Sequence, residues 1–222
     1  MPQPALIFDL DGTLVESAAD LHAAVAVLFA EREAPAPSLD EVISYIGHGI
    51  PALVESCFAA AGATMTRGQF EQAVARFSAI YSVSPAALSR TYPGVPAALS
   101  VFAARGIPLA VCTNKAEAVT RKMLDALHLS GYFSVVIGGD TLRVRKPDPE
   151  MLYACARGLG VGLDQLCFVG DSETDAATAS AARIPFVLFT RGYRKAAIRD
   201  IAHADRFDDW LELPALVARL AR

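Results

Sequence analysis

Ala5-Leu-Ile-Phe-Asp-Leu-Asp-Gly-Thr13 is the stretch of sequence that decides the fold. Four apolar residues end abruptly in two aspartates and a glycine, which is typical of a strand buried on both faces whose polar residues emerge at its carboxyl end. Asp9 and Asp11 stand two residues apart, so their carboxylates point the same way if the extended conformation continues. Asp and Gly are also common in turns. This fragment alone therefore leaves both catalysis and a plain turn open.

Strand-like and helix-like segments alternate through the second half of the chain, after Tyr92-Pro93-Gly94. The sequence predicts helices at 96–104, 117–127, 149–159 and 175–182, and strands at 108–112, 135–137, 166–169 and 185–189. Repeated units of this kind require right-handed crossovers between parallel strands covered by helices. We predict an α/β fold with a doubly wound, mostly parallel, Rossmann-like sheet.

Residues 17–81 have a different texture, rich in alanine and with helical periodicity. The expected helices are 19–31, 39–45, 50–61 and 68–81. Ser38 is a candidate N-cap, and Gly62 ends the third helix as a C-cap. The block is predicted to be a small helical bundle inserted after the first strand.

Composition excludes several classes of partner. The chain has 222 residues, 53% of them apolar, which suits one core domain with an insertion. A net charge of −4 without a basic run argues against a nucleic-acid polymer as partner. The four cysteines are far apart and are expected to be buried thiols in a reducing cytoplasm. The longest apolar stretch, 23–30, is too short to span a membrane, and the sequence predicts neither membrane insertion nor export.

Polar clusters follow the other expected strands as well. Thr113 and Asn114 follow the second, Lys146 lies in the loop after the third, and Asp171 and Asp175 follow the fourth. Singly, these residues suit helix caps or a solvated loop lysine. Ligands of such sheets bind at the carboxyl ends of the strands, so acids, a hydroxyl and a lysine on one edge indicate a site.

These clusters together resemble the four motifs of the haloacid dehalogenase-like superfamily. The matching residues are Asp9-Leu-Asp-Gly-Thr13, Thr113, Lys146 with Pro147, and Gly170-Asp171 with Asp175. The helical block resembles the cap that this superfamily places after the first motif. By that resemblance, residues 16–86 form the cap, and residues 1–15 and 87–222 form the catalytic core.

The resemblance implies a phosphatase in which Asp9 attacks phosphorus and forms an aspartyl-phosphate. At the ordinary aspartate pKa of about 3.9, Asp9 is expected to be ionised at neutral pH. Asp11 would protonate the leaving oxygen and then activate the hydrolytic water.

A magnesium cofactor is implied because an anionic nucleophile must approach an anionic phosphate. The family pattern assigns the ion to the Asp9 carboxylate, the Asp11 carbonyl and the Asp171 carboxylate, with Asp175 orienting this shell. The same pattern assigns binding of the phosphate oxygens to Thr113, the Asn114 N–H and Lys146. Lys146 would also supply positive charge to Asp9.

The substrate expected from the resemblance is 2-phosphoglycolate. The segment Ile46-Gly47-His48-Gly49 is similar to the phosphoglycolate phosphatase group, as are 158–162 and Thr190-Arg191-Gly192-Tyr193. Residues 47–50 are expected near the carboxylate of this small phosphorylated metabolite, where His48 is a candidate donor. The protein is expected to be a monomer or a homodimer.

Other activities fit the same motifs. A sugar phosphate, a nucleotide or pyrophosphate could be the substrate, and a hexose phosphate mutase would retain the phosphoryl group. A phosphonatase fits less well because it uses a cap lysine, and Lys115 is the first lysine of this chain. A catalytically silent binding protein on the same fold is the alternative from another class, although the chain retains the acidic residues and Lys146.

Overall fold

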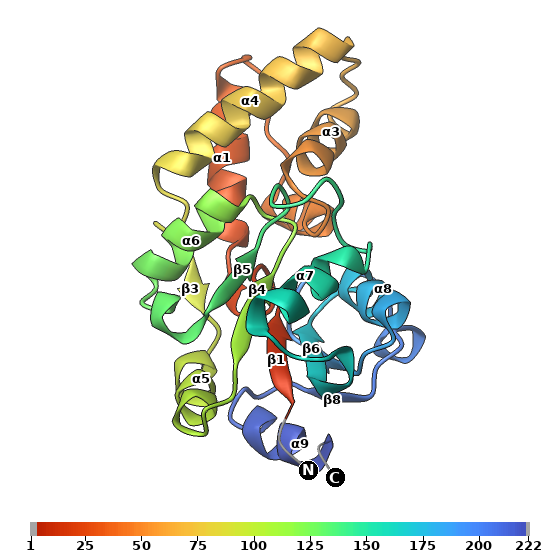
Figure 1. Ribbon diagram of the computed structural model, residues 1–222. Coiled ribbons are helices and arrows are strands. Elements are labelled where there is room, and N and C mark those ends of the chain that lie inside the picture. The colour runs from red at the N-terminus through yellow and green to blue at the C-terminus, as the bar shows by residue number, and fades with distance from the viewer. Residues whose placement is uncertain (1–3, 221–222) are drawn as a thin grey trace.

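The computed structural model describes residues 4–220, which build a six-stranded parallel sheet and a smaller two-stranded one (Figure 1). The order in the large sheet is β5-β4-β1-β6-β7-β8, and each neighbouring pair is parallel. Its strands are β1 (Ala5–Phe8), β4 (Leu109–Cys112), β5 (Val135–Ile137), β6 (Leu166–Gly170), β7 (Phe186–Phe189) and β8 (Asp205–Phe207). The predicted doubly wound sheet is confirmed.

The central position of β1 creates the switch point of the sheet. The chain moves from β1 outward to β4 and β5, then returns to the other side of β1 with β6 and continues to β7 and β8. Such a reversal opens a crevice outside the carboxyl ends of the central strands. The ends of β1, β4 and β6, which carry the acidic residues, Thr113 and Asn114, therefore meet at one place.

Helices cover both faces of the large sheet (Figure 1). The first face packs against α5 (Val95–Ala104), α6 (Glu117–Ala126) and α9 (Leu213–Leu220), and the second against α7 (Glu150–Leu159) and α8 (Glu173–Ala182). Short 3-10 turns occur at Ser130–Tyr132, Leu163–Gln165 and Ile198–Asp200. Strands buried on both faces explain why β1, β4 and β7 read as unbroken apolar runs.

The helices of the first half lie together beyond the carboxyl edge of the sheet, at the top of Figure 1. They are α1 (Ala18–Ala30), α2 (Leu39–Tyr45), α3 (Ile50–Ala60) and α4 (Arg67–Val83). Ser38 caps α2 as predicted, in a capping box with Glu41, and Thr66 caps α4 in the same way with Gln69. Gly62 follows α3 with a φ of 70°, the left-handed conformation that ends helices.

Two chain crossings join this helical segment to the sheet. Val15–Glu16 (β2) pairs antiparallel with Arg90–Thr91 (β3), where the chain leaves and returns. Beside them, the buried Asp20 carboxylate accepts hydrogen bonds from the backbone N–H groups of Leu88 and Ser89, at 2.7–3.1 Å. A buried carboxylate satisfied by several donors fixes the geometry of the two connections.

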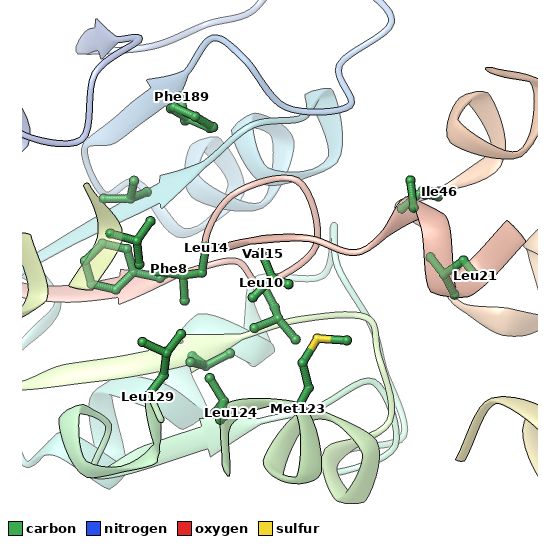
Figure 2. Close-up of a cluster of buried hydrophobic side chains, with 14 of the residues drawn as sticks. Phe8, Leu10, Leu14, Val15, Leu21, Ile46, Met123, Leu124, Leu129 and Phe189 are labelled. Atoms are coloured by element: carbon green, nitrogen blue, oxygen red, sulfur yellow. The ribbon is translucent and has the colours of Figure 1, made fainter. Parts of the chain in front are cut away.

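The larger hydrophobic cluster extends from the first face of the sheet to the helical segment (Figure 2). Phe8 of β1 is fully buried and contacts the rings of Phe102 and Trp210 at centroid distances of 6.4 and 5.9 Å. Burying a side chain of this size stabilises the fold by about 2–3 kcal/mol. Leu10 belongs to the same buried cluster as Met123 (Figure 2), so the loop that carries Asp9 and Asp11 is anchored in the core.

Several elements were not predicted from the sequence. These are β2, β3, β8, α9 and the 3-10 turns. The predicted helices and strands otherwise match the observed ones within one or two residues at each end, as is usual for element boundaries. Among residues 4–220, no helix has the length and apolar character needed to cross a membrane.

Candidate active site

The loop after β1 places Asp9 and Asp11 at the carboxyl edge of the sheet. The Asp9 N–H donates to the Val169 carbonyl of β6 at 2.9 Å, which continues the pairing of β1 one residue beyond the strand. The chain then turns at Gly12, which has a φ of 83°. A Cβ at this position would lie 2.5 Å from Asp171 Oδ2, so glycine is required both by the backbone conformation and by the close approach of the two motifs.

Lys146 forms buried ion pairs with both Asp9 and Asp175. Lys146 Nζ lies 2.8 Å from Asp9 Oδ1 and 2.6 Å from Asp175 Oδ1. The contact with Asp9 is an ion pair without the geometry of a hydrogen bond, whereas Lys146 donates a hydrogen bond to Asp175. Although burial alone would lower the pKa of Lys146, the carboxylates of Asp175 and Asp9 raise it. Lys146 is therefore a permanent cation beside Asp9.

Asp171 is held on both oxygens. Thr13 Oγ1 donates to Asp171 Oδ1 at 2.6 Å, and the Tyr193 N–H donates to Asp171 Oδ2 at 2.6 Å. The hydroxyl of Tyr193 in turn accepts hydrogen bonds from the N–H groups of Ser17 and Ala18, at the start of α1. One residue thus connects the acidic centre to the entrance of the helical segment.

Asp175 organises the centre from behind. It lies in the first turn of α8, and its Oδ2 accepts the hydroxyl of the N-cap residue Ser172 at 2.6 Å and the Asp171 N–H at 3.3 Å. Capping of a helix and placement of an acidic residue, which were alternatives from the sequence, therefore coexist. A Cβ at Gly170 would lie 2.7 Å from Asp175 Oδ2, so this strand end also needs glycine.

The donor set fits a divalent metal ion. Asp9, Asp171 and Asp175 are buried, and each offers one oxygen within 4.8 Å of the others. Burial, with repulsion from Asp175, raises the pKa of Asp9 to about 7, and the pKa of Asp171 is raised well above its usual range by burial and by Asp175 and Asp9. The expectation that Asp9 is ionised at neutral pH with an ordinary pKa is therefore wrong for the metal-free protein. Oxygen ligands with excess negative charge suit a hard divalent cation.

Asp11 belongs to a separate ion pair that the sequence did not predict. Lys115 Nζ donates to both Asp11 oxygens, at 2.7 and 2.8 Å, and Ser17 Oγ also donates to Asp11 Oδ1. Burial alone would lower the pKa of Lys115, but the Asp11 carboxylate raises it. Its position directly after Thr113 and Asn114 is the signal that could have pointed to Lys115.

Thr113 and Asn114 follow β4 as expected, but they do not begin a helix. The N-cap of α6 is Ala116, two residues later. The Asn114 side chain bridges two loops, because Nδ2 donates to the carbonyls of Gly47 and Lys146 and Oδ1 accepts the Lys146 N–H. Among residues 4–220, the Asn114 backbone N–H has no hydrogen-bond acceptor, so it remains available to a ligand.

A pocket of about 480 Å³, its open mouth included, lies over these groups. The core lines it with Asp9, Asp11, Thr113, Asn114, Lys115 and Lys146. The helical segment lines it with Leu21, Ile46, Gly47, Gly49, Ile50, Leu53 and Tyr81. Five of the core residues chosen from the sequence, together with Gly47, Gly49 and Ile50, therefore face one small cavity. Asp171 lines an adjoining pocket with Asp9, Asp11 and His48.

All the site residues chosen from the sequence thus converge at the carboxyl edge of four neighbouring strands, β5, β4, β1 and β6. Thr13, Ser17, Tyr81, Lys115 and Tyr193 also belong to this centre, and the sequence alone gave none of them a role. An acidic cluster, a buried lysine and the free Asn114 N–H at one pocket can hold an anion beside a metal ion and a carboxylate nucleophile.

This fold and centre define a hydrolase of the doubly wound α/β class. Residues 6–189 match the family model described as haloacid dehalogenase-like hydrolase, and the chain belongs to that family of enzymes. A relative from Cereibacter sphaeroides named phosphoglycolate phosphatase is 43% identical over 98% of this chain and 99% of its own length. One of the same name from Rhodospirillum rubrum is 44% identical over 96% of this chain and 90% of its own.

Solved structures show the same architecture. The crystal structure of a predicted phosphoglycolate phosphatase from Haemophilus somnus superposes with a TM-score of 0.90 and 30% identity, covering 96% of this chain and 97% of that one. A hydrolase of the haloacid dehalogenase-like family from Streptococcus pneumoniae has a TM-score of 0.84 over 96% of this chain and 98% of its own. Because the two sequences are only 20% identical, this similarity shows the fold alone. These relatives and the shared fold support phosphatase activity.

Proposed function

We propose that this protein hydrolyses 2-phosphoglycolate to glycolate and phosphate, with Mg²⁺ as cofactor and an aspartyl-phosphate intermediate on Asp9. The observation that carries the proposal is the placement of Asp9 beside Lys146 in a small pocket that the helical segment lines from the other side. The substrate follows from relatives named phosphoglycolate phosphatase that are 43% and 44% identical over nearly the whole chain.

Asp9 acts as the nucleophile. Its Oδ1 oxygen accepts no well-aligned hydrogen bond from residues 4–220, although Lys146 lies 2.8 Å away. Asp9 lines the pocket beside this cation, so its carboxylate can approach a phosphorus atom held there. The leaving alkoxide departs on the opposite side, and water later hydrolyses the acyl phosphate, so hydrolysis proceeds in two displacements.

Asp11 acts as general acid and then as general base. It stands two residues after Asp9 and lines the same pocket, so it can reach the leaving oxygen on the face opposite to the attack. Its carboxylate lies outside the cluster of Asp9, Asp171 and Asp175. An acid–base group must stay off the metal to exchange its proton. Lys115 and Ser17 hold Asp11 in this position.

The metal ion would be held by the carboxylates of Asp9 and Asp171 and by the Asp11 carbonyl. When bound, it offsets the repulsion between Asp9 and the phosphate and stabilises charge on the transferred group. Asp175 has both oxygens engaged, one by Lys146 and one by Ser172 and the Asp171 N–H, so it orients the metal ligands without binding the ion itself.

Thr113, the Asn114 N–H and Lys146 bind the phosphate oxygens. The Asn114 N–H lacks an internal acceptor among the described residues, and its side chain fixes the loop by three hydrogen bonds. Donors that are fixed before the substrate arrives stabilise the transition state without reorganisation.

The helical segment, residues 16–86, acts as a cap over the core formed by residues 1–15 and 87–222. Asn114 of the core donates to the Gly47 carbonyl at 2.9 Å, and a Cβ at Gly49 would lie 3.2 Å from the Asn114 carbonyl. These contacts place the loop before α3 directly on the site. Opening of the cap would admit the substrate, and closure would exclude water.

The ligand is a small phosphorylated metabolite, and the protein works as a monomer or a homodimer. All four thiols are free and buried, which suits a reducing cytoplasm.

The test is phosphate release from 2-phosphoglycolate, glucose 6-phosphate, nucleoside monophosphates and pyrophosphate, with Mg²⁺ or with EDTA. A preference for 2-phosphoglycolate that disappears with EDTA is the expected result. A preference for another ester would contradict the substrate assignment and retain the chemistry. Conversion of a hexose phosphate without phosphate release would indicate a mutase, and no turnover of any compound would indicate the silent binding protein.

A further inference from the structure

The hydroxyl of Tyr81 is buried without a partner. Tyr81 lies near the end of α4, its side chain is 2% exposed, and its oxygen makes no hydrogen bond among residues 4–220. Buried hydroxyls are nearly always hydrogen-bonded, because an unsatisfied polar group loses its interaction with water and gains nothing. An unsatisfied group that lines a ligand pocket is therefore a candidate ligand contact.

The position of the Tyr81 ring is fixed by its neighbours. The Lys115 ammonium lies over the ring, 4.9 Å from its centroid, and the ring of Phe77 packs against it at 5.9 Å. The same ammonium donates its hydrogen bonds to the two oxygens of Asp11, which balances its charge. The lysine therefore holds the aromatic ring by a cation–π contact, and no contact of the hydroxyl among residues 4–220 has the geometry of a hydrogen bond.

Tyr81 is the polar side chain in an otherwise apolar part of the pocket wall. The helical segment lines the pocket through four aliphatic side chains, two glycines and Tyr81. Burial raises the pKa of Tyr81 to about 12, so the hydroxyl keeps its proton at neutral pH and is able to donate. The wall therefore offers one side-chain donor to the part of a substrate that points away from Asp9.

We propose that Tyr81 is a specificity-determining residue whose hydroxyl donates a hydrogen bond to an anionic group at the non-phosphate end of the substrate. The inference rests on the proposed function, in which this group is the carboxylate of 2-phosphoglycolate. One methylene group separates that carboxylate from the phosphate ester oxygen. A donor in the wall of the phosphate pocket is thus near enough to contact it.

Ethyl phosphate provides the matched comparison. It has the same phosphate ester and the same chain length, with a methyl group where 2-phosphoglycolate has its carboxylate. A residue that reads the carboxylate discriminates between the two esters, whereas a residue that supports the fold or the phosphoryl centre affects both. Hydrogen bonds to charged groups change such discrimination by about 10- to 100-fold.

The experiment compares Tyr81→Phe with the wild type, using Tyr45→Phe as control. Tyr45 lies in α2 of the same helical segment, is half-buried and does not line the pocket. Phenylalanine keeps the ring contacts with Lys115 and Phe77. The expected result is a fall of about 10-fold or more in kcat/KM for 2-phosphoglycolate, mainly through KM, with less than about 2-fold change for ethyl phosphate. Tyr45→Phe should change neither.

Equal losses on both esters, or no loss on 2-phosphoglycolate, would overturn the proposal. The wild type separates this failure from failure of the proposed function. If the wild type has the same kcat/KM for ethyl phosphate and for 2-phosphoglycolate, then both the substrate assignment and the role of Tyr81 are wrong. If the wild type prefers 2-phosphoglycolate and Tyr81→Phe keeps that preference, only the role of Tyr81 is wrong.

Discussion

Lys115 Nζ donates to both oxygens of the Asp11 carboxylate, at 2.7 and 2.8 Å, in a buried ion pair at the wall of the pocket. Two hydrogen bonds from one fixed cation restrict the rotation of a carboxylate that would otherwise choose among several rotamers. The orientation of the proposed acid–base group therefore depends on a residue from a different strand end.

Lys115→Met is expected to lower kcat about 10-fold or more, because Asp11 loses its orientation. The measurement is steady-state phosphate release from 2-phosphoglycolate. Lys122→Met, an exposed lysine of α6, is the control and should behave like the wild type. An unchanged kcat in Lys115→Met would show that Asp11 is positioned without it.

Thr13→Val removes the hydroxyl that donates to Asp171 Oδ1 at 2.6 Å and nearly preserves the volume of the side chain. Hydrogen bonds that orient a metal ligand affect metal affinity by about 10- to 100-fold. The Mg²⁺ concentration for half-maximal activity should therefore rise about 10-fold or more. Thr13→Ser keeps the hydroxyl and should remain close to the wild type. Equal Mg²⁺ requirements in all three proteins would contradict the orienting role of Thr13.

Metal affinity should rise with pH up to about neutrality. Burial raises the pKa of Asp9 to about 7 in the metal-free protein, above its value in the unfolded chain, so the native state holds a proton that a metal ion must displace. Below pH 7, displacement of this proton should make the half-saturating Mg²⁺ concentration in a thermal-shift titration fall about 10-fold for each unit by which the pH is raised. Asp9→Asn should weaken that dependence. A pH-independent affinity would contradict the raised pKa of Asp9.

Gly192→Ala should disrupt the centre although residue 192 carries no functional side chain. A Cβ there would lie 2.3 Å from Asp171 Oδ2 and 2.3 Å from the Gly12 carbonyl. Overpacking of this kind costs about 1–3 kcal/mol of stability, and displacement of Asp171 should lower activity about 10-fold or more. Gly68→Ala is the matched control, because a Cβ at that helical position meets open space. Wild-type activity in Gly192→Ala would contradict the tight contact.

The sequence predicted the sheet well because its strands are buried on both faces. A short apolar run such as Ala5–Phe8 that ends in acidic residues is typical of a central strand of a parallel sheet. By contrast, β8 (Asp205–Phe207) has one buried residue and two charged ones, and its place beside β7 depends on long-range pairing rather than on local pattern. Edge strands of this kind carry little periodic signal.

Within the site, the motif residues could be predicted from the sequence, whereas the residues that hold them in position could not. Asp9, Lys146 and Asp171 stand in recognisable spacings, whereas Tyr193 reaches Asp171 through its backbone N–H from 22 residues away. A backbone donor has no side-chain signature in the sequence. Tyr81 is a further example, because nothing local distinguishes it from an ordinary core tyrosine of a helix, and only the pocket gives it a role.

The most direct test of the account is phosphate release from 2-phosphoglycolate by Asp9→Asn, measured with Mg²⁺ beside the wild type and Asp164→Asn, an exposed control. The amide keeps the shape of the side chain and removes the nucleophile, so turnover should fall at least about 10³-fold while the melting transition stays cooperative. The control should retain full activity. Appreciable turnover by Asp9→Asn would contradict the assignment of Asp9 as the nucleophile.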